Sequence, residues 1–227
     1  MIANDQQLVL DLPHRPALEA EDFIVSDSNA AADDMIARWP NWPGYGLVLV
    51  GSEGAGKTHL AHVWRLRSGA ALVSAKSLST VDAADLATAS GIAVEDVDAG
   101  TFDERALFHL LNLAREQNFS VLLTARQAPG TWDITLPDLR SRVRSLPVIA
   151  IEPADDDLLA AVLVKLFSDR QIPATPTAVR HLARHMDRSM EFALQLVENI
   201  DRRVWDTSRM VTRDLARSVL AEMQGLN

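Results

Sequence analysis

The stretch Gly51-Ser52-Glu53-Gly54-Ala55-Gly56-Lys57-Thr58 decides the fold of this chain. Residues 45–50, directly before it, read Tyr-Gly-Leu-Val-Leu-Val, and this apolar, β-branched run predicts a buried strand. Residues 59–66, directly after it, carry apolar side chains at helical spacing. A strand, a glycine-rich loop and a helix in this order are typical of a loop that binds the phosphates of a nucleotide.

The residue types in this loop fit phosphate chemistry. Glycines allow backbone N–H groups to approach a phosphate closely, and the following helix adds the positive end of its dipole. Lys57 is expected to reach the terminal phosphates, and the Thr58 hydroxyl to ligate Mg²⁺. A turn that binds nothing would leave several independent positions unexplained, so the pattern predicts ADP or ATP with Mg²⁺. The predicted nucleotide-binding residues of this segment are Gly51, Glu53, Gly54, Ala55, Gly56, Lys57, Thr58 and His59.

Composition and charge restrict the class of protein. The chain has 227 residues, of which 48% are hydrophobic, enough for one large domain or for a medium one and a small one. It has no cysteine, which excludes disulfides and thiolate metal sites. No apolar run reaches the roughly 18 residues of a membrane span and the N-terminus is polar, so we expect a cytoplasmic protein without a membrane partner. The net charge of −9 argues against autonomous DNA binding, for which basic residues supply most of the affinity.

The N-terminal region is expected to be extended. Residues 1–20 contain two prolines and no helical periodicity. Within them, residues 7–12 read Gln-Leu-Val-Leu-Asp-Leu, and in an extended segment Leu8, Leu10 and Leu12 would lie on one side. This pattern fits docking into a groove of a partner and, equally well, an edge strand of the chain's own sheet. Further on, Ile24 and Val25 are expected to pack either against the base of a nucleotide or in the core.

A second group of polar residues follows strands that lie beyond the loop. Residues 70–74 and 91–94 are predicted strands, and the latter ends in Glu95 and Asp96. Adjacent carboxylates about forty residues after a phosphate-binding loop are typical of a Walker B element, which holds the Mg²⁺ shell and orients an attacking water. The alternative is an acidic turn without function. Residues 119–124 form the next predicted strand, and its last residue, Thr124, is expected either beside the γ-phosphate or as an ordinary strand residue.

The second half of the chain changes its pattern. A helix is predicted over 102–118, a short one over 136–143 that presents Arg140 and Arg142, and a last strand over 148–151. From Asp155 onward all the periodicity is helical, which places a domain boundary near Pro153. The predicted organisation is an arm (1–20), an α/β nucleotide-binding domain with a parallel sheet (21–153) and a small all-helical lid domain (154–227).

Several of these segments together resemble the AAA+ ATPases and, within them, the replication initiator DnaA and its shortened relatives. Residues 23–29 are similar to the segment that opens the initiator's ATPase domain, and 51–60 to its Walker A loop. Residues 122–124 resemble sensor one, while 139–142 and 151–153 resemble the box that holds the arginine finger. The likeness covers about residues 21–220 and implies an AAA+ P-loop domain followed by a helical lid.

The resemblance also implies partners. Arg142 lies at the place of the arginine finger, which would act in trans on ATP bound to DnaA, with Arg140 as a rival two positions away. Residues 7–12 are similar to motifs that dock on the polymerase sliding clamp (beta subunit), with Gln7, Leu10 and Leu12 as anchors and Leu8 beside them. AAA+ proteins also pair with their own copies, so a homo-oligomer is a further expectation. An initiator continues into a helix-turn-helix domain, whereas this chain ends at Asn227, so no sequence-specific DNA binding is expected.

Two positions depart from the family pattern. Glu95 stands where the first Walker B aspartate is usual, so the carboxylate that would face Mg²⁺ is one methylene longer. In the lid, Glu191 falls at the place of the sensor-two arginine, and a carboxylate would repel a phosphate. Either Arg188, one turn earlier, makes the phosphate contact, or the chain binds ADP or binds nucleotide weakly.

Three functions follow as hypotheses. In the first, the protein binds the sliding clamp and stimulates hydrolysis of DnaA-bound ATP, which makes it a negative regulator of replication initiation. In the second, it is a nucleotide-dependent adaptor that does not stimulate hydrolysis. In the third, it is an independent ATPase related to DnaA or to a helicase loader. Whether the chain is itself an enzyme stays open, and rapid turnover of its own is not expected.

Overall fold

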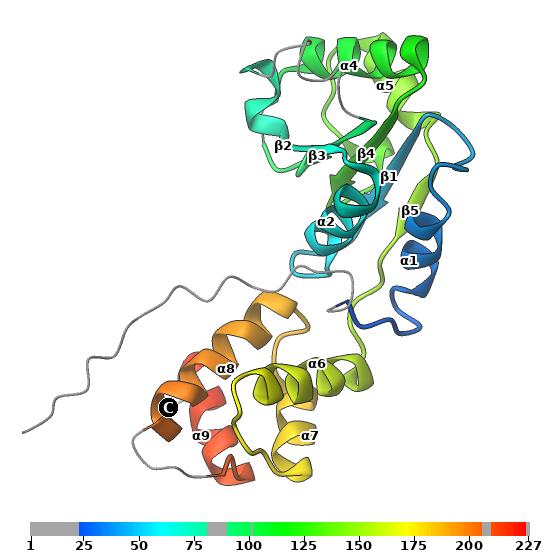
Figure 1. Ribbon diagram of the computed structural model, residues 1–227. Coiled ribbons are helices and arrows are strands. Elements are labelled where there is room, and N and C mark those ends of the chain that lie inside the picture. The colour runs from blue at the N-terminus through cyan, green and yellow to red at the C-terminus, as the bar shows by residue number, and fades with distance from the viewer. Residues whose placement is uncertain (1–22, 81–89, 101, 206–209, 226–227) are drawn as a thin grey trace, which may run out of the picture.

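A parallel sheet forms the first half of the protein. The computed structural model describes residues 23–80, 90–100, 102–205 and 210–225 (Figure 1). All strands pair in parallel, in the order β2-β3-β4-β1-β5, so that the loop-bearing strand β1 lies between β4 and β5. The strands are β1 (Gly46–Val50), β2 (Ala71–Ser74), β3 (Gly91–Glu95), β4 (Ser120–Ala125) and β5 (Val148–Ala150).

Helices cover both faces of this sheet, because side chains of parallel strands alternate between two buried faces. Val48, Val94 and Leu123 belong to the cluster that packs against α4 and α5, whereas Leu49 and Leu122 belong to the cluster beneath α1 and α2. The helices of this part are α1 (Ala30–Ala37), α2 (Lys57–Ser68), α4 (Glu104–Gln117) and α5 (Pro137–Arg144), with short 3₁₀ turns at Ala75–Thr80 and Pro129–Thr131.

After β5 the described chain is helical. Helices α6 (Asp156–Asp169), α7 (Pro176–His185), α8 (Met190–Trp205) and α9 (Arg213–Met223) pack around a separate cluster that includes Leu159, Leu163 and Leu196. Figure 1 shows these helices at the bottom of the view, below the carboxyl ends of the strands, with α4 and α5 at the top. The predicted class, an α/β domain with a parallel sheet followed by a helical lid, is confirmed.

The carboxyl ends of the parallel strands meet at the edge that faces the helical part. The phosphate-binding loop follows β1, Asp96 follows β3 and Arg126 follows β4. Polar side chains from segments far apart in the sequence are therefore brought together there. In the described ranges, no helix is long and apolar enough to cross a membrane.

Candidate functional site

The glycine-rich loop is held closed by its own lysine. Gly54 and Gly56 have φ angles of +71° and +100°, a region that favours glycine. The Lys57 ammonium donates hydrogen bonds of 2.8 Å to the carbonyl oxygens of Gly51 and Ser52. Burial of the side chain lowers the pKa of Lys57, and the nearby Asp96 carboxylate opposes this effect. The Lys57 side chain thus lies at the centre of the loop.

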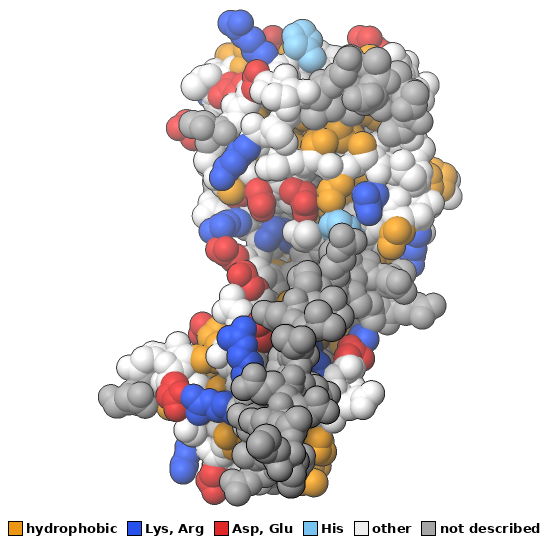
Figure 2. Space-filling model, turned by 60° about the vertical axis from the view of Figure 1, so that its left-hand side comes forward, with side chains coloured by type: hydrophobic (Ala, Val, Ile, Leu, Met, Phe, Trp, Pro, Cys, Tyr) orange, Lys and Arg blue, Asp and Glu red, His pale blue; other side chains and the backbone are white. Residues whose placement is uncertain are grey.

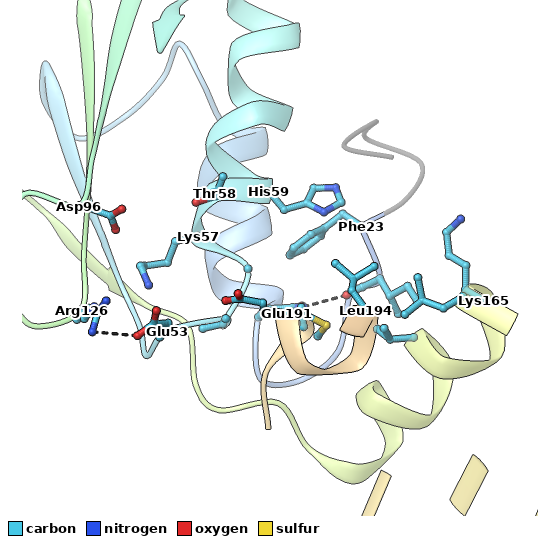
Figure 3. Close-up of a pocket in the computed structure, with 18 of the residues that line it drawn as sticks. Phe23, Glu53, Lys57, Thr58, His59, Asp96, Arg126, Lys165, Glu191 and Leu194 are labelled. Atoms are coloured by element: carbon cyan, nitrogen blue, oxygen red, sulfur yellow. Dashed lines mark hydrogen bonds and ion pairs between the residues drawn. The ribbon is translucent and has the colours of Figure 1, made fainter. Parts of the chain in front are cut away.

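A cavity of about 520 Å³ lies between this loop and the helical lid. Its size is within the range of small-molecule and cofactor sites. Figure 3 shows that Lys57, Asp96 and Arg126 lie at one end, while Phe23 and Leu194 lie toward the other. The cavity thus has a charged end at the phosphate-binding loop and a mostly apolar end between Phe23 and the lid.

The apolar end is formed by three elements. Phe23 packs edge-to-face on His59, with ring centroids 5.2 Å apart. Opposite them, α6 and α8 supply apolar side chains, and α6 adds an ion pair of 3.2 Å between Lys165 and Asp169. An aromatic wall facing aliphatic residues is the kind of surface that a nucleobase occupies. The lid residues that line the cavity are Val162, Lys165, Leu166, Asp169, Met190, Glu191 and Leu194.

Helix α8 contacts the loop directly. The backbone N–H of Met190 donates a 3.1 Å hydrogen bond to the carbonyl oxygen of Gly54. A Cβ atom added to Gly54 would lie 2.5 Å from the Cβ of Ser189, which is closer than real Cβ atoms approach other atoms. Only glycine therefore allows this contact, which brings the first turn of α8 and its Glu191 to the cavity.

The ends of β3 and β4 are joined by a hydrogen bond. Thr124 is buried, and its hydroxyl oxygen accepts a 3.1 Å bond from the backbone N–H of Asp96, a residue in left-handed conformation with φ +56°. One carboxylate oxygen of Glu95 is buried without a hydrogen-bond partner. Thr124 therefore positions Asp96 and does not itself line the cavity.

The residues present fit a magnesium ion. Thr58 and Asp96 both line the cavity, and the unpartnered oxygen of Glu95 offers a further acceptor next to Asp96 in the chain. Among the described residues no group of three or more His, Cys, Asp or Glu side chains could hold a metal ion alone. Mg²⁺ bound to one or two protein ligands takes its remaining ligands from phosphates and water. A nucleotide and Mg²⁺ would accordingly bind together.

The structure brings most of the predicted binding residues to the cavity and leaves others away from it. Those that line it are Ile24, Glu53, Gly54, Ala55, Gly56, Lys57, Thr58, His59 and Asp96. Gly51 is buried beside the loop and accepts the Lys57 bond, whereas Val25 is 52% exposed and does not line the cavity. Gln7, Leu8, Leu10 and Leu12, which were predicted to bind the sliding clamp, lie outside the described residues.

Arg188 differs from its expected place. Its guanidinium donates 2.7 Å bonds to the carbonyl oxygen of Ala154 and to the Asp156 carboxylate, at the start of α6. This pair belongs to a charged cleft on the lid that does not include the phosphate-binding loop. Arg188, two residues before α8, therefore ties the start of α8 to the start of α6, and α8 contributes Glu191 and no arginine to the cavity.

The sequence prediction missed several lining residues. The lid residues Val162, Leu166 and Asp169 follow helical spacing on one face of α6, so periodicity could have singled out that face. Asn29 and Arg126 carry no such signal. Asn29 is buried and bonds the carbonyl oxygen of Ile24, and Arg126 forms a 3.0 Å ion pair with Glu53 of the loop.

The arginines of α5 lie on the α/β part. Arg142 is half-buried, with its guanidinium carbon 5.6 Å from the centre of the Phe108 ring of α4. Arg140 is exposed and bonds the carbonyl oxygen of Ile134, and Arg144 donates a 3.2 Å bond to that of Gly130. Figure 1 shows α5 beside α4, away from the lid, and none of these three arginines lines the cavity.

The start of α5 is fixed by Glu104 of α4. Its carboxylate accepts bonds of 2.8 and 2.7 Å from the backbone N–H groups of Thr135 and Leu136, and one of 3.0 Å from the Thr135 hydroxyl. The hydrogen bond from the Thr135 N–H is the main cause that lowers the pKa of Glu104. The ionised Glu104 carboxylate therefore orients the helix that bears Arg140, Arg142 and Arg144.

Together, the glycine-rich loop, the strand order and the helical lid give this chain the fold of an AAA+ P-loop domain. The structure is similar to domain III of the Thermotoga maritima replication initiation protein DnaA, with a TM-score of 0.78, 16% identity and coverage of 93% of this chain and 98% of that one. AMPPCP-bound DnaA from Aquifex aeolicus gives a TM-score of 0.68 at 18% identity, over 84% of this chain and 66% of that chain. The Thermotoga maritima Holliday junction motor RuvB gives 0.70 at 16%, over 92% and 72%. No protein-family model matches the chain, and identities this low show the fold alone.

Proposed function

We propose that this chain is a DnaA-related AAA+ regulator of replication initiation, of the Hda type. It holds ADP or ATP with Mg²⁺ in the cavity between loop and lid, and it stimulates hydrolysis of the ATP bound to DnaA. The observation that carries the proposal is a cavity lined by residues 53–58 of the phosphate-binding loop, in a fold that matches a DnaA ATPase domain along almost its full length. One of the similar DnaA structures is bound to AMPPCP, which supports a nucleotide as the occupant.

Each end of the cavity would hold one part of the nucleotide. Loop N–H groups and Lys57 would bind the phosphates, and Phe23 with the lid residues would hold the base. Thr58 and Asp96 would ligate Mg²⁺, which neutralises phosphate charge, and the hydroxyl of buried Thr124 would keep the backbone of Asp96 in place. The Lys57 ammonium would exchange the two backbone carbonyls for phosphate oxygens.

Stimulation of DnaA would come from Arg142 acting in trans. A guanidinium beside the transferring phosphoryl group stabilises charge in the transition state and is worth roughly 10³–10⁵ in rate, or about 4–7 kcal/mol. Leaving Phe108 would cost Arg142 roughly 0.5–1 kcal/mol, a typical value for a cation–π contact near the surface. The stabilisation of the transition state exceeds the cost of leaving Phe108. The contact with Phe108 would therefore hold Arg142 in the free protein without preventing it from acting on DnaA.

The N-terminal arm would bring the protein to newly replicated DNA. Its glutamine and leucines, Gln7, Leu8, Leu10 and Leu12, would bind the rim and the apolar pocket of a groove on the sliding clamp. The net charge of −9 supports recruitment through a protein and not through autonomous DNA binding.

The test is DnaA ATP hydrolysis measured with and without this protein in the presence of DNA-loaded clamp. The intact chain is expected to stimulate hydrolysis at least tenfold, Arg142→Ala to abolish the stimulation, and Arg144→Ala, on the same helix, to retain it. Arg140→Ala decides between the two candidate fingers. Gln7→Ala should abolish the stimulation only under assay conditions in which the stimulation depends on the clamp. Absence of stimulation by the intact chain contradicts the proposal.

One observation favours the adaptor as a second candidate. Arg142 and Arg140 both have partners in their own chain, Phe108 and the Ile134 carbonyl. If the protein held DnaA without stimulating it, Arg142→Ala would leave DnaA hydrolysis unchanged, while Gln7→Ala would still abolish binding to the clamp. The same assay without DnaA measures turnover by the chain alone, which an independent ATPase requires.

A further inference from the structure

Among the described residues that line the cavity, Arg126 is the one arginine, and it directly follows a strand of the sheet. Arg126 follows the last residue of β4 and lines the cavity together with Lys57 and Asp96. The lid contributes Glu191 at the same cavity, and Arg188 is bonded to Ala154 and Asp156 outside it. Figure 2 shows the acidic and basic side chains that gather at the constriction between the α/β part and the helical part.

Arg126 is close to the place that terminal phosphates would occupy. One of its terminal nitrogens lies 3.0 Å from the Glu53 carboxylate, which belongs to the phosphate-binding loop (Figure 3). Its charge also acts on the Lys57 ammonium, the group that reaches the terminal phosphates in loops of this kind. The two cations therefore face the same part of the cavity.

The backbone of Arg126 is fixed independently of its side chain. The Asp98 carboxylate accepts 2.9 and 2.8 Å bonds from the backbone N–H groups of Arg126 and Gln127. These bonds hold the turn after β4 whether the Arg126 guanidinium binds Glu53 or another anion. The side chain can exchange Glu53 for another anion without unfolding of the turn.

We propose that Arg126 binds the terminal phosphate of the bound nucleotide, and that Glu53 holds this guanidinium until the nucleotide arrives. The role rests on the proposed nucleotide binding. The side chains of Arg126 and Glu53 are 50% and 66% exposed, so their ion pair contributes little free energy and is easily replaced. A phosphate offers charged oxygens in the geometry that a guanidinium prefers. The strand end would thus supply the arginine that the lid lacks.

Affinities for ADP, ATP and AMP, measured by isothermal titration calorimetry with Mg²⁺, test this role. Arg126→Ala is expected to weaken binding of the nucleotide whose terminal phosphate it contacts by about 10- to 100-fold, and AMP binding by less than about threefold. Arg126→Lys should restore part of the loss, since it keeps the charge but not the paired donors. Glu53→Gln should tighten binding a few-fold, because it frees the guanidinium and removes a like charge from the site.

Arg67→Ala, an exposed arginine in the last turn of α2 that does not line the cavity, is the matched control and is expected to leave all three affinities within about twofold. Thermal unfolding of each empty variant verifies that it folds. If the intact chain binds and Arg126→Ala binds equally well, or if Arg67→Ala loses as much as Arg126→Ala, the role of Arg126 is wrong while the nucleotide site stands. If the intact chain binds no nucleotide, the nucleotide site is wrong and the role of Arg126 is lost with it.

Discussion

The two sides of the cavity are constructed in different ways. The loop side comes from one continuous stretch, residues 53–59, all of which line the cavity. The lid side comes from single faces of α6 and α8, and the Met190 N–H of α8 donates a hydrogen bond to the Gly54 carbonyl oxygen of the loop. The loop is therefore a local structure, and the lid depends on packing between segments more than a hundred residues apart.

Because of this difference, variants can separate the contribution of the loop to nucleotide binding from that of the lid. Changes in the loop should alter phosphate binding whatever the lid does. Changes in the lid should alter binding of the base, or the closeness of lid and loop, and leave phosphate binding largely intact. Variants that violate this division would show that the two sides act as one unit.

The largest effect is expected at Lys57. Lys57→Ala removes the buried ammonium at the centre of the loop, so affinity for ADP and ATP should fall by more than about 100-fold. Arg67→Ala, an exposed residue in the last turn of α2, is the control and should bind normally. Calorimetry measures both variants. An affinity of Lys57→Ala within tenfold of the intact chain contradicts the assignment of the charged end.

The success of the sequence prediction follows the same division. The strands, the helices and the loop residues were predictable because each depends on local periodicity or on a local motif, as in residues 51–58. Arg188 and Glu191 were both named from the sequence, but which of them faces the cavity depends on how α8 begins. The bonds from Arg188 to Ala154 and Asp156 decide that, and they join segments more than thirty residues apart.

Arg126 was not predicted for a related reason. Its side chain reaches the loop only because β4 is the direct neighbour of β1, an order that the sequence does not state. Thr124 shows the opposite case. It was predicted as the last residue of its strand, but β4 continues to Ala125, and the Thr124 hydroxyl accepts a bond from the Asp96 N–H and does not line the cavity.

The contact between loop and lid can be broken at Gly54. Gly54→Ala places a Cβ 2.5 Å from that of Ser189 and puts alanine at φ +71°, a strain of about 1–2 kcal/mol before the clash is counted. The melting temperature should fall by several degrees and nucleotide affinity should fall with it. Gly130→Ala, whose added Cβ has no atom within 4 Å, should change neither.

The double variant Gly54→Ala with Ser189→Gly separates the two causes of this effect. Removing the Ser189 side chain relieves the clash and leaves the backbone strain, so part of the lost melting temperature should return. No recovery at all would mean that the first turn of α8 does not rest on Gly54.

The apolar end of the cavity is tested by two residues of the same helix. Leu166 lines the cavity from α6, whereas Val164 is 56% exposed and does not. Leu166→Ala should weaken ADP binding about three- to tenfold through lost apolar burial and leave inorganic tripolyphosphate binding unchanged. Val164→Ala should change neither affinity. Equal losses for ADP and tripolyphosphate would show that the lid also governs the charged end.

The smallest effect concerns the lid alone. Burial lowers the pKa of His181, and the neighbouring His185 on α7 and Arg213 and Arg217 on α9 act in the same direction. Below pH 6.5 the imidazole at this position therefore binds a proton in the unfolded chain more readily than in the folded chain. Stability falls as the pH decreases from 6.5 through the lowered pKa of the folded state.

His181→Gln removes this proton uptake. Its melting temperature should decrease less between pH 7.5 and pH 5 than that of the intact chain, by about 1–3 °C, in thermal unfolding followed by circular dichroism. Nucleotide affinity should stay unchanged, since His181 does not line the cavity. If both proteins show the same pH dependence, groups other than His181 cause the acid sensitivity of the lid. If the nucleotide affinity changes, the packing of α7 and α9 affects the loop through α8.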